Sequence, residues 1–236
     1  MMVAWSELSD KIDDAPSGKM TNAVRIRKIL LQAIGEGTLP AGARIIEKEL
    51  GEALSVSRTP LREALSALRS EQIVERDEDG LRVRKLAWQD VRDLYEMRGT
   101  LEGMAARLAA RHASASECQI IGNLCEEEAA LIAKQAEPDA LSQLNKRFHN
   151  TILQAAGNQF LSDELRRLSR LTLLLGSTVY SLTDRLSMIQ AEHLAITNAI
   201  CAKDEEAAEA EMRAHLSQGL AARLMIMAQI QGPELD

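Results

Sequence analysis

Apolar residues recur at helical spacing through the first part of the chain, and this spacing predicts three helices. The first is expected over residues 21–36, with Thr21 or Asn22 as its cap. A short helix is expected over 47–53, and a third from an N-cap at Ser57 to about residue 71. The apolar faces of the first and third helices would comprise Val24, Ile26, Ile29, Leu30, Ala33 and Ile34, and Leu61, Ala64, Leu65 and Leu68.

The period changes from helical to alternating after the third helix. Residues 73–76 and 81–85 alternate between apolar and charged side chains, and an Asp-Glu-Asp-Gly sequence ending at Gly80 separates them. An Asp-Gly pair between two such segments predicts a β-hairpin. The order helix, short helix, helix and hairpin is that of a winged helix-turn-helix.

From Trp88 onward the pattern is helical throughout. Short polar breaks separate six predicted helices, at 88–112, 114–135, 138–156, 158–180, 184–202 and 204–230. Short connections favour an antiparallel bundle of six or seven helices. We therefore expect a mainly α protein in three parts, namely an N-terminal arm (1–18), a winged helix-turn-helix domain (19–86) and an all-helical domain (87–232).

Composition favours a helical protein and excludes some classes. Hydrophobic residues make up 46% of the chain but aromatic residues only 3%, whereas strands prefer aromatic and β-branched side chains. No segment approaches the ~18 consecutive apolar residues of a transmembrane helix, and the N-terminus lacks the regions of a signal peptide. The three cysteines include no C-x-x-C pair, which argues against disulfides or a cysteine zinc site and fits a reducing cytoplasm.

The charge is distributed unevenly along the chain. The formal net charge is −7, but residues 19–85 hold 13 Lys and Arg against 10 Asp and Glu, a net of +3. The remainder holds 15 against 25, a net of −10. The asymmetry suggests a basic interaction module attached to an acidic domain, and chance clustering is the alternative.

The start of the third helix carries side chains suited to reading DNA. Arg58 and Arg62 are four residues apart and so share one helix face, and arginine bonds the guanine edge through two nitrogens. The hydroxyls of Ser57 and Thr59 could hold phosphates at the helix N-terminus. Lys48, on the preceding helix, could reach base or backbone. The alternative is a surface helix whose arginines are merely solvated.

Three of the four histidines lie where a helical bundle could bring them together. Asn145 and His149 share one helix face, and His193 and His215 lie on the fifth and sixth predicted bundle helices. Imidazole nitrogens and a side-chain oxygen suit a divalent metal ion, for which zinc is favoured and nickel or manganese are alternatives. The opposing interpretation is three separate histidines, each satisfied by its own hydrogen bonds. His112 is assigned to the charge of a helix C-terminus instead.

Arg98 is a candidate for binding an effector. It lies on a helix face directed at the predicted core, where a buried guanidinium needs an anionic partner. That partner could be the carboxylate of a small organic acid. An ion pair with Glu102, four residues later, is the alternative.

The N-terminal part resembles the DNA-binding domain of the GntR family of bacterial regulators. The resemblance rests on the sequence VSRTPLREAL, which begins at Val56, together with the preceding GTLPAG and EKEL segments. It implies that Lys48, Arg58, Thr59 and Arg62 contact DNA, and that Gly80 is the wing-tip glycine near the minor groove. The wing tip departs from the family because its residues 77–79 are all acidic, which puts wing contact in doubt.

The C-terminal part resembles the FCD effector domain of the FadR-like branch of that family, nearer its VanR-like subgroup if the bundle has six helices. Segments around residues 94–102 and 145–158, and His193 with His215, carry the resemblance. It implies a divalent metal held by Asn145, His149, His193 and His215, with Asn in a place where Asp is common. The expected function is a homodimeric repressor of operator DNA that a small carboxylate effector controls. A metal-responsive regulator and, less favoured, a metal-dependent enzyme are the alternatives.

Overall fold

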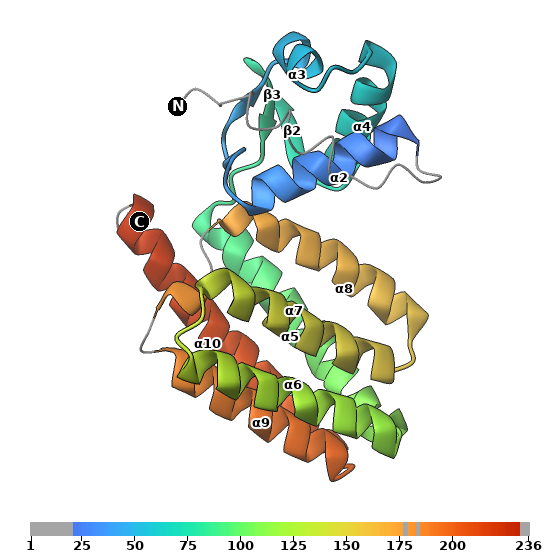
Figure 1. The fold of residues 1–236 in the computed structure, drawn as a ribbon, viewed down its shortest axis with the longest axis vertical. Coiled ribbons are helices and arrows are strands. Elements are labelled where there is room, and N and C mark those ends of the chain that lie inside the picture. The colour runs from blue at the N-terminus through green and yellow to red at the C-terminus, as the bar shows by residue number, and fades with distance from the viewer. Residues whose placement is uncertain (1–20, 177–178, 183–184, 232–236) are drawn as a thin grey trace. The chain divides into compact units, whose positions relative to one another are not determined.

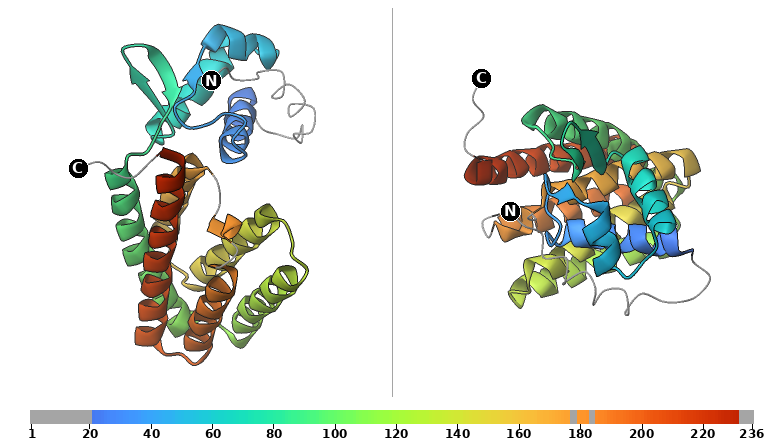
Figure 2. Two further views of the ribbon diagram at one scale, coloured as in Figure 1. Left: turned by 90° about the vertical axis from the view of Figure 1, so that its left-hand side faces the viewer. Right: turned by 90° about the horizontal axis from the view of Figure 1, so that it is seen from above.

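The computed structural model describes residues 21–176, 179–182 and 185–231, and the chain divides into two compact units (Figures 1 and 2). The first unit contains the described residues up to Leu86 together with Ser169–Gly176, and the second contains the rest. The arm predicted for residues 1–18 lies outside the described residues. Among the described helices, none has both the length and the apolar character that a membrane span requires.

The first helix of the first unit is α2 (Asn22–Gly35), which Thr21 caps as predicted. The hydroxyl of Thr21 accepts a hydrogen bond from the backbone N–H of Val24 at 3.4 Å. The buried face of α2 comprises Ile26, Ile29, Leu30, Ala33 and Ile34. The assignment of Val24 to this face was wrong, because its side chain is 46% exposed in the first turn of the helix.

Helices α3 (Glu47–Ala53) and α4 (Arg58–Ser70) form the predicted helix-turn-helix. The turn between them includes Ser55, whose φ of 48° lies in the left-handed region. Ser57 is the N-cap residue of α4, with extended backbone angles, but its hydroxyl makes no cap hydrogen bond. The predicted apolar face of α4 is buried in full, through Leu61, Ala64, Leu65 and Leu68.

The predicted hairpin is formed by β2 (Val74–Asp77) and β3 (Gly80–Val83). Asp77 pairs with Gly80, so residues 78–79 make a two-residue turn, and Gly80 has a φ of 122° that favours glycine. A third strand, β1 (Arg44–Ile45), pairs antiparallel with β3 and gives the sheet order β1-β3-β2. The sequence pattern did not predict β1, because a two-residue strand is too short to show alternation.

The segment Ser169–Gly176 belongs to the first unit, which the sequence did not predict. Within this unit, Glu71 follows the end of α4 and accepts two hydrogen bonds from Arg27 of α2, at 2.7 and 2.6 Å. The Nε atom of Arg170 lies 2.9 Å from the same carboxylate. Two guanidinium groups on one carboxylate therefore tie Ser169–Gly176 to α2 and to the end of α4.

Among the residues that the structure describes after Leu86, six α-helices are present, the number of helices predicted for the bundle, although the last three residues of the fourth belong to the first unit. In chain order they are α5 (Trp88–His112), α6 (Ala115–Ala133), α7 (Pro138–Ala155), α8 (Gln159–Leu171), α9 (Leu186–Cys201) and α10 (Glu205–Gln231). Helix α5 packs mainly against α10, and α6 packs against α7 and α9 (Figure 1). This packing brings α5, α7, α9 and α10 close enough to share one polar site in the core.

The helix predicted over residues 158–180 was wrong in its second half. Helix α8 ends at Leu171, and a 3₁₀ helix, η1 (Thr172–Leu175), follows it. Gly176 then takes a φ of 67°, which no α-helix accommodates, and a second 3₁₀ helix, η2 (Val179–Ser181), comes after it. The apolar run that contains Leu171 and Leu173–Leu175 resembled a helix in sequence, so periodicity alone did not reveal the break.

Candidate DNA-reading surface and metal centre

The predicted DNA-reading side chains lie together on the exposed start of α4. Ser57, Arg58, Thr59 and Arg62 are all exposed, as is Lys48 on α3. The Ser57 hydroxyl makes no cap hydrogen bond, so it and the first backbone N–H groups of α4 can donate hydrogen bonds to a phosphate. The structure therefore presents this set of residues to solvent, which a DNA-reading role requires.

Arg62 has a partner in the absence of DNA. Its Nε donates to Glu47 Oε2 at 2.8 Å, and the hydrogen bond to Glu47 raises the pKa of Arg62. The Arg62 side chain is 67% exposed, and exposed ion pairs contribute little to stability because water screens them. A base edge can therefore replace Glu47 as the partner of Arg62 at small cost.

The acidic wing tip is partly neutralised from within the hairpin. Arg82 of β3 forms an ion pair with Asp77, and its Nη2 lies 3.5 Å from Asp79 Oδ2. The guanidinium of Arg82 therefore faces the carboxylates of the wing. A Cβ at Gly80 would meet nothing within 4 Å, so the need for glycine there comes from its φ and not from crowding.

The bundle brings three of the four histidines to one place. His149 lies on α7, His193 on α9 and His215 on α10, and one ligand nitrogen of each lies within 4.8 Å of the others. His112 is outside this cluster, and its Nδ1 lies 3.0 Å from the carbonyl oxygen of Ala156. Asn145 precedes His149 by one helical turn and is half-buried, so it shares the face of α7 that carries His149.

Each of the three imidazoles faces a glutamate through its Nδ1. His193 Nδ1 lies 2.8 Å from Glu128, His215 Nδ1 lies 2.8 Å from Glu192, and His149 Nδ1 lies 2.6 Å from Glu102. A neutral imidazole that donates from Nδ1 presents the lone pair of Nε2 on its other side, as metal-binding histidines do. The sequence did not reveal Glu102 and Glu128 in this role, because each lies on a different helix from its histidine.

The glutamates are held in turn by further polar side chains. Arg98 Nε donates to Glu102 at 2.8 Å, Arg185 donates to Glu192 at 2.6 and 2.9 Å, and the Tyr180 hydroxyl donates to Glu128 at 3.2 Å. Burial alone would raise the pKa of Glu102, but Arg98 and His149 lower it well below its usual range. The ion pair of Arg98 with Glu102 is the alternative that the sequence left open beside an effector role.

A divalent metal ion fits the cluster. His193 is 1% exposed, and its Nε2 has no hydrogen-bond partner among the described residues, a costly state for a buried polar atom unless a ligand satisfies it. Burial lowers the pKa of His193, and it lowers that of His215 to about 3. Both imidazoles therefore stay neutral at physiological pH and keep the lone pairs that a metal requires.

These shifts predict that the metal-free protein loses stability in mild acid. The unfolded chain takes up protons on histidine near pH 6.5, whereas folded His215 does so only near pH 3. Between these values the unfolded state binds more protons, so stability is highest above the unfolded pKa and falls as the pH drops. For His215 the loss between pH 7 and pH 5 should be about 2 kcal/mol. Chemical denaturation of chelator-treated protein at several pH values measures this loss of stability. His215→Asn should flatten the profile of unfolding free energy against pH. Equal profiles for the two proteins would contradict the prediction.

Comparison with known proteins assigns both the N-terminal and the C-terminal part of the chain to protein families. The profile for bacterial regulatory proteins of the gntR family matches residues 22–83, and the FCD domain profile matches residues 93–218, more than half of the chain. The chain is 30% identical over 215 residues to a protein named as a probable D-xylose utilization operon transcriptional repressor of Paenarthrobacter nicotinovorans, covering 89% of this chain and 93% of that one. It is also 30% identical over 199 residues to the transcriptional repressor RspR of Escherichia coli K12, covering 82% and 85%.

Solved structures show the same fold. Escherichia coli McbR/YncC superposes with a TM-score of 0.75 at 21% identity, covering 88% of this chain and 99% of that one. A GntR regulator from Rhodococcus sp. RHA1 gives 0.67 at 22% identity, covering 87% and 99%. The matched profiles and named relatives are transcriptional regulators and not enzymes, in agreement with the expectation from the sequence. The chain therefore belongs to the GntR family of DNA-binding bacterial transcriptional regulators and carries an FCD domain C-terminal to its winged helix-turn-helix.

Proposed function

We propose that the protein is a repressor whose affinity for operator DNA is controlled by a small organic acid bound at a metal ion in the second unit. The observation that carries this proposal is the cluster of His149, His193 and His215, with a buried and unpartnered Nε2 on His193. Residues 19–86 would act as the DNA-binding domain and residues 87–232 as the domain that binds the effector and dimerises.

The ligand set leaves the metal open to a further ligand. Three imidazole nitrogens, with the side-chain oxygen of Asn145 as a fourth ligand, leave coordination positions free on a metal that takes five or six ligands. Zinc is favoured by the imidazoles, and nickel or manganese would also fit a nitrogen and oxygen set. A neutral amide in the place of a carboxylate gives the metal less negative charge, which favours an anionic effector.

The charges around the cluster also favour an anion. Three carboxylates surround the cluster: Glu102 pairs with Arg98 and Glu192 with Arg185, whereas Glu128 faces His193 and the Tyr180 hydroxyl. Three negative and two positive groups leave a charge of −1, and a divalent metal changes this to +1. A monocarboxylate would neutralise the metal-loaded site, and buried sites gain most from such neutrality. Arg98, which is 15% exposed, is the side chain we assign to the effector, in addition to its pairing with Glu102.

Repression would require two copies of the chain. A homodimer would place two α4 helices in successive major grooves, about 34 Å apart, and read a pseudo-palindromic operator. The effector would act if it bound better to one arrangement of the dimer than to the other, and so shifted the population away from the DNA-competent spacing.

A metal-responsive regulator is the second candidate, and the same cluster supports it. In that case the metal would be the signal, and operator affinity would change with metal alone. The two candidates differ in whether an organic acid has an effect on protein that is already loaded with metal.

The experiment is an operator titration by fluorescence anisotropy with full-length protein, on a DNA fragment selected from random sequence by the protein itself. Zinc-loaded and chelator-treated proteins are each titrated with a panel of small mono-, di- and tricarboxylic acids. We expect at least one acid to change operator affinity ~10-fold or more, and only in the zinc-loaded protein. A response to zinc with none to any acid would favour the metal-responsive candidate, and a response to neither would refute both.

A further inference from the structure

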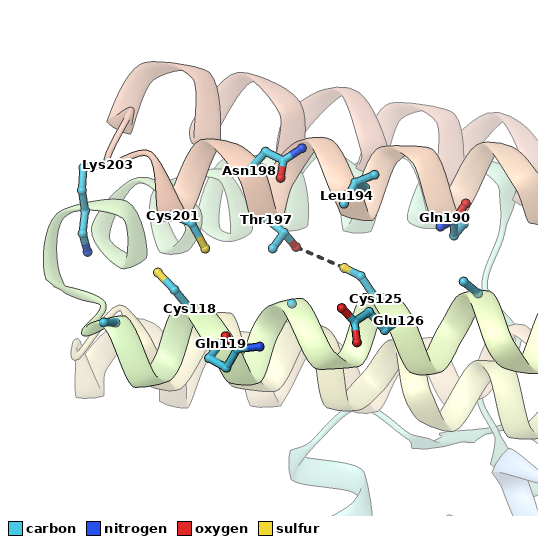
Figure 3. Close-up of a pocket in the computed structure, with 13 residues that line it drawn as sticks. Cys118, Gln119, Cys125, Glu126, Gln190, Leu194, Thr197, Asn198, Cys201 and Lys203 are labelled. Atoms are coloured by element: carbon cyan, nitrogen blue, oxygen red, sulfur yellow. Dashed lines mark hydrogen bonds between the residues drawn. The ribbon is translucent and has the colours of Figure 1, made fainter.

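A groove of the second unit lies between α6 and α9, on a face that the proposed metal site does not use. It has a volume of about 640 Å³, and all three cysteines of the chain line it (Figure 3). Cys118 lies at the start of α6 and Cys125 two turns further on, whereas Cys201 is the last residue of α9. The sequence argued against disulfides because the three cysteines include no C-x-x-C pair.

Two of the three thiols meet across the groove. The sulfur atoms of Cys118 and Cys201 point toward one another from facing helices (Figure 3). Lys203 donates from Nζ to the carbonyl of Ala113, and this contact holds the end of α9 against the start of α6. Cys118 is half-buried and Cys201 is exposed, so small reagents can reach the pair.

Cys125 has a different environment from the other two. It is buried, and its sulfur lies 3.2 Å from the hydroxyl of Thr197. Cys125 therefore lies in the same groove but contacts Thr197 instead of a second thiol. It is a matched control for the Cys118 and Cys201 pair.

We propose that Cys118 and Cys201 form a redox-responsive dithiol, which a hydroperoxide converts to an intramolecular disulfide between α6 and α9. The exposed Cys201 thiolate attacks one peroxide oxygen, so a sulfur–oxygen bond forms, the oxygen–oxygen bond breaks, and the leaving hydroxide takes the thiol proton as water. The sulfur of Cys118 then attacks the sulfenic sulfur of Cys201. A disulfide forms, the sulfur–oxygen bond breaks, and a second water leaves with the Cys118 proton. Two thiols lose two electrons and the peroxide gains them.

The surroundings of the pair make this reaction slow at neutral pH. Burial, with smaller contributions from Cys118 and Cys125, raises the pKa of Cys201 to about 11, although Lys203 opposes the rise. Little thiolate is present at neutral pH, and the thiolate is the reactive form. The pair would thus remain reduced in ordinary cytoplasm and close under oxidative load, faster as the pH rises.

Closure would affect the helices that supply part of the metal site. Glu128 lies on α6, and His193, which it faces, lies on α9. A covalent link between the two helices restricts their relative movement and removes conformational freedom from the unfolded chain. We therefore expect the oxidised protein to melt about 5 °C or more above the reduced protein.

The test treats full-length protein with hydrogen peroxide at pH 8.5, then counts free thiols in denaturant and maps peptides without reduction. Thiols should fall from the three of the sequence to one, with a disulfide joining tryptic peptides 112–134 and 186–203. Cys125→Ser should still form this link, whereas Cys118→Ser and Cys201→Ser should not, and thermal melts show that each variant is folded. Three remaining thiols, a link through Cys125, or a link between two chains would each overturn the proposal.

Discussion

Replacing Arg58 and Arg62 together by alanine is expected to abolish sequence-specific operator binding. Both side chains are exposed at the start of α4, where a recognition helix meets base edges. Each bidentate contact to guanine contributes about 1–3 kcal/mol, so the double substitution should weaken binding by roughly 10²–10⁴-fold. The measurement is anisotropy with the selected operator and with unrelated DNA, at one fixed salt concentration. The loss should be specific to the operator, because non-specific attraction to a chain with a net charge of −7 is already weak.

Arg69 provides the matched control for this experiment. It is exposed in the last turn of the same helix, away from the end that reads bases. Arg69→Ala should keep operator affinity within about threefold, since it removes one charge distant from the base edges. If Arg69→Ala lost as much operator affinity as the double variant at Arg58 and Arg62, only overall charge would matter. The DNA-reading assignment would then be wrong.

Replacing His193 by glutamine is expected to remove most of the metal affinity. Its buried Nε2 has no hydrogen-bond partner among the described residues, and glutamine has a similar size but cannot reproduce an imidazole supported by Glu128. Structural zinc sites are worth about 10–16 kcal/mol over about four ligands, so one lost ligand should cost about 100-fold or more in zinc affinity. Competition with a chromogenic chelator measures the affinity. The response of operator binding to the effector should disappear together with the metal.

Two further variants make this result specific to the proposed geometry. Glu128→Gln keeps all three imidazoles and removes only the charged acceptor at His193 Nδ1, so zinc affinity should fall less, by about 10–100-fold. His112→Ala removes a histidine that bonds the Ala156 carbonyl outside the cluster, and zinc affinity should be unchanged. If His112→Ala weakened zinc binding as much as His193→Gln, the ligand set would be wrong.

Local patterns gave reliable predictions wherever neighbouring residues decide the structure. The bounds of α3 were predicted to the residue, and Ser57 was placed correctly as the N-cap of α4. Failures occurred where a local signal was ambiguous. The exposed Val24 fitted the apolar period of α2, and the apolar residues before Gly176 resembled a continued helix although the backbone turns there.

The histidine cluster was predicted only in part, for a physical reason. Spacing places Asn145 with His149 on one helix face, but the approach of His193 and His215 depends on how α7, α9 and α10 pack. The resemblance to a family supplied that step. Neither spacing nor resemblance named Glu102 as a partner of His149 or Glu128 as a partner of His193, because carboxylates are common on helices and nothing near them in sequence indicates this role.

The sequence by itself determined the class of protein, since helical and alternating periods and the contiguous VSRTPLREAL segment are properties of residues close along the chain. Only the tertiary structure decided which groups share a site. The pairing of Glu128 with His193, of Arg185 and Glu192 with His215, and of Cys118 with Cys201 joins separate helices or helix ends. Such pairings depend on the rotation and register of packed helices, which the burial of the whole core sets and no local pattern encodes.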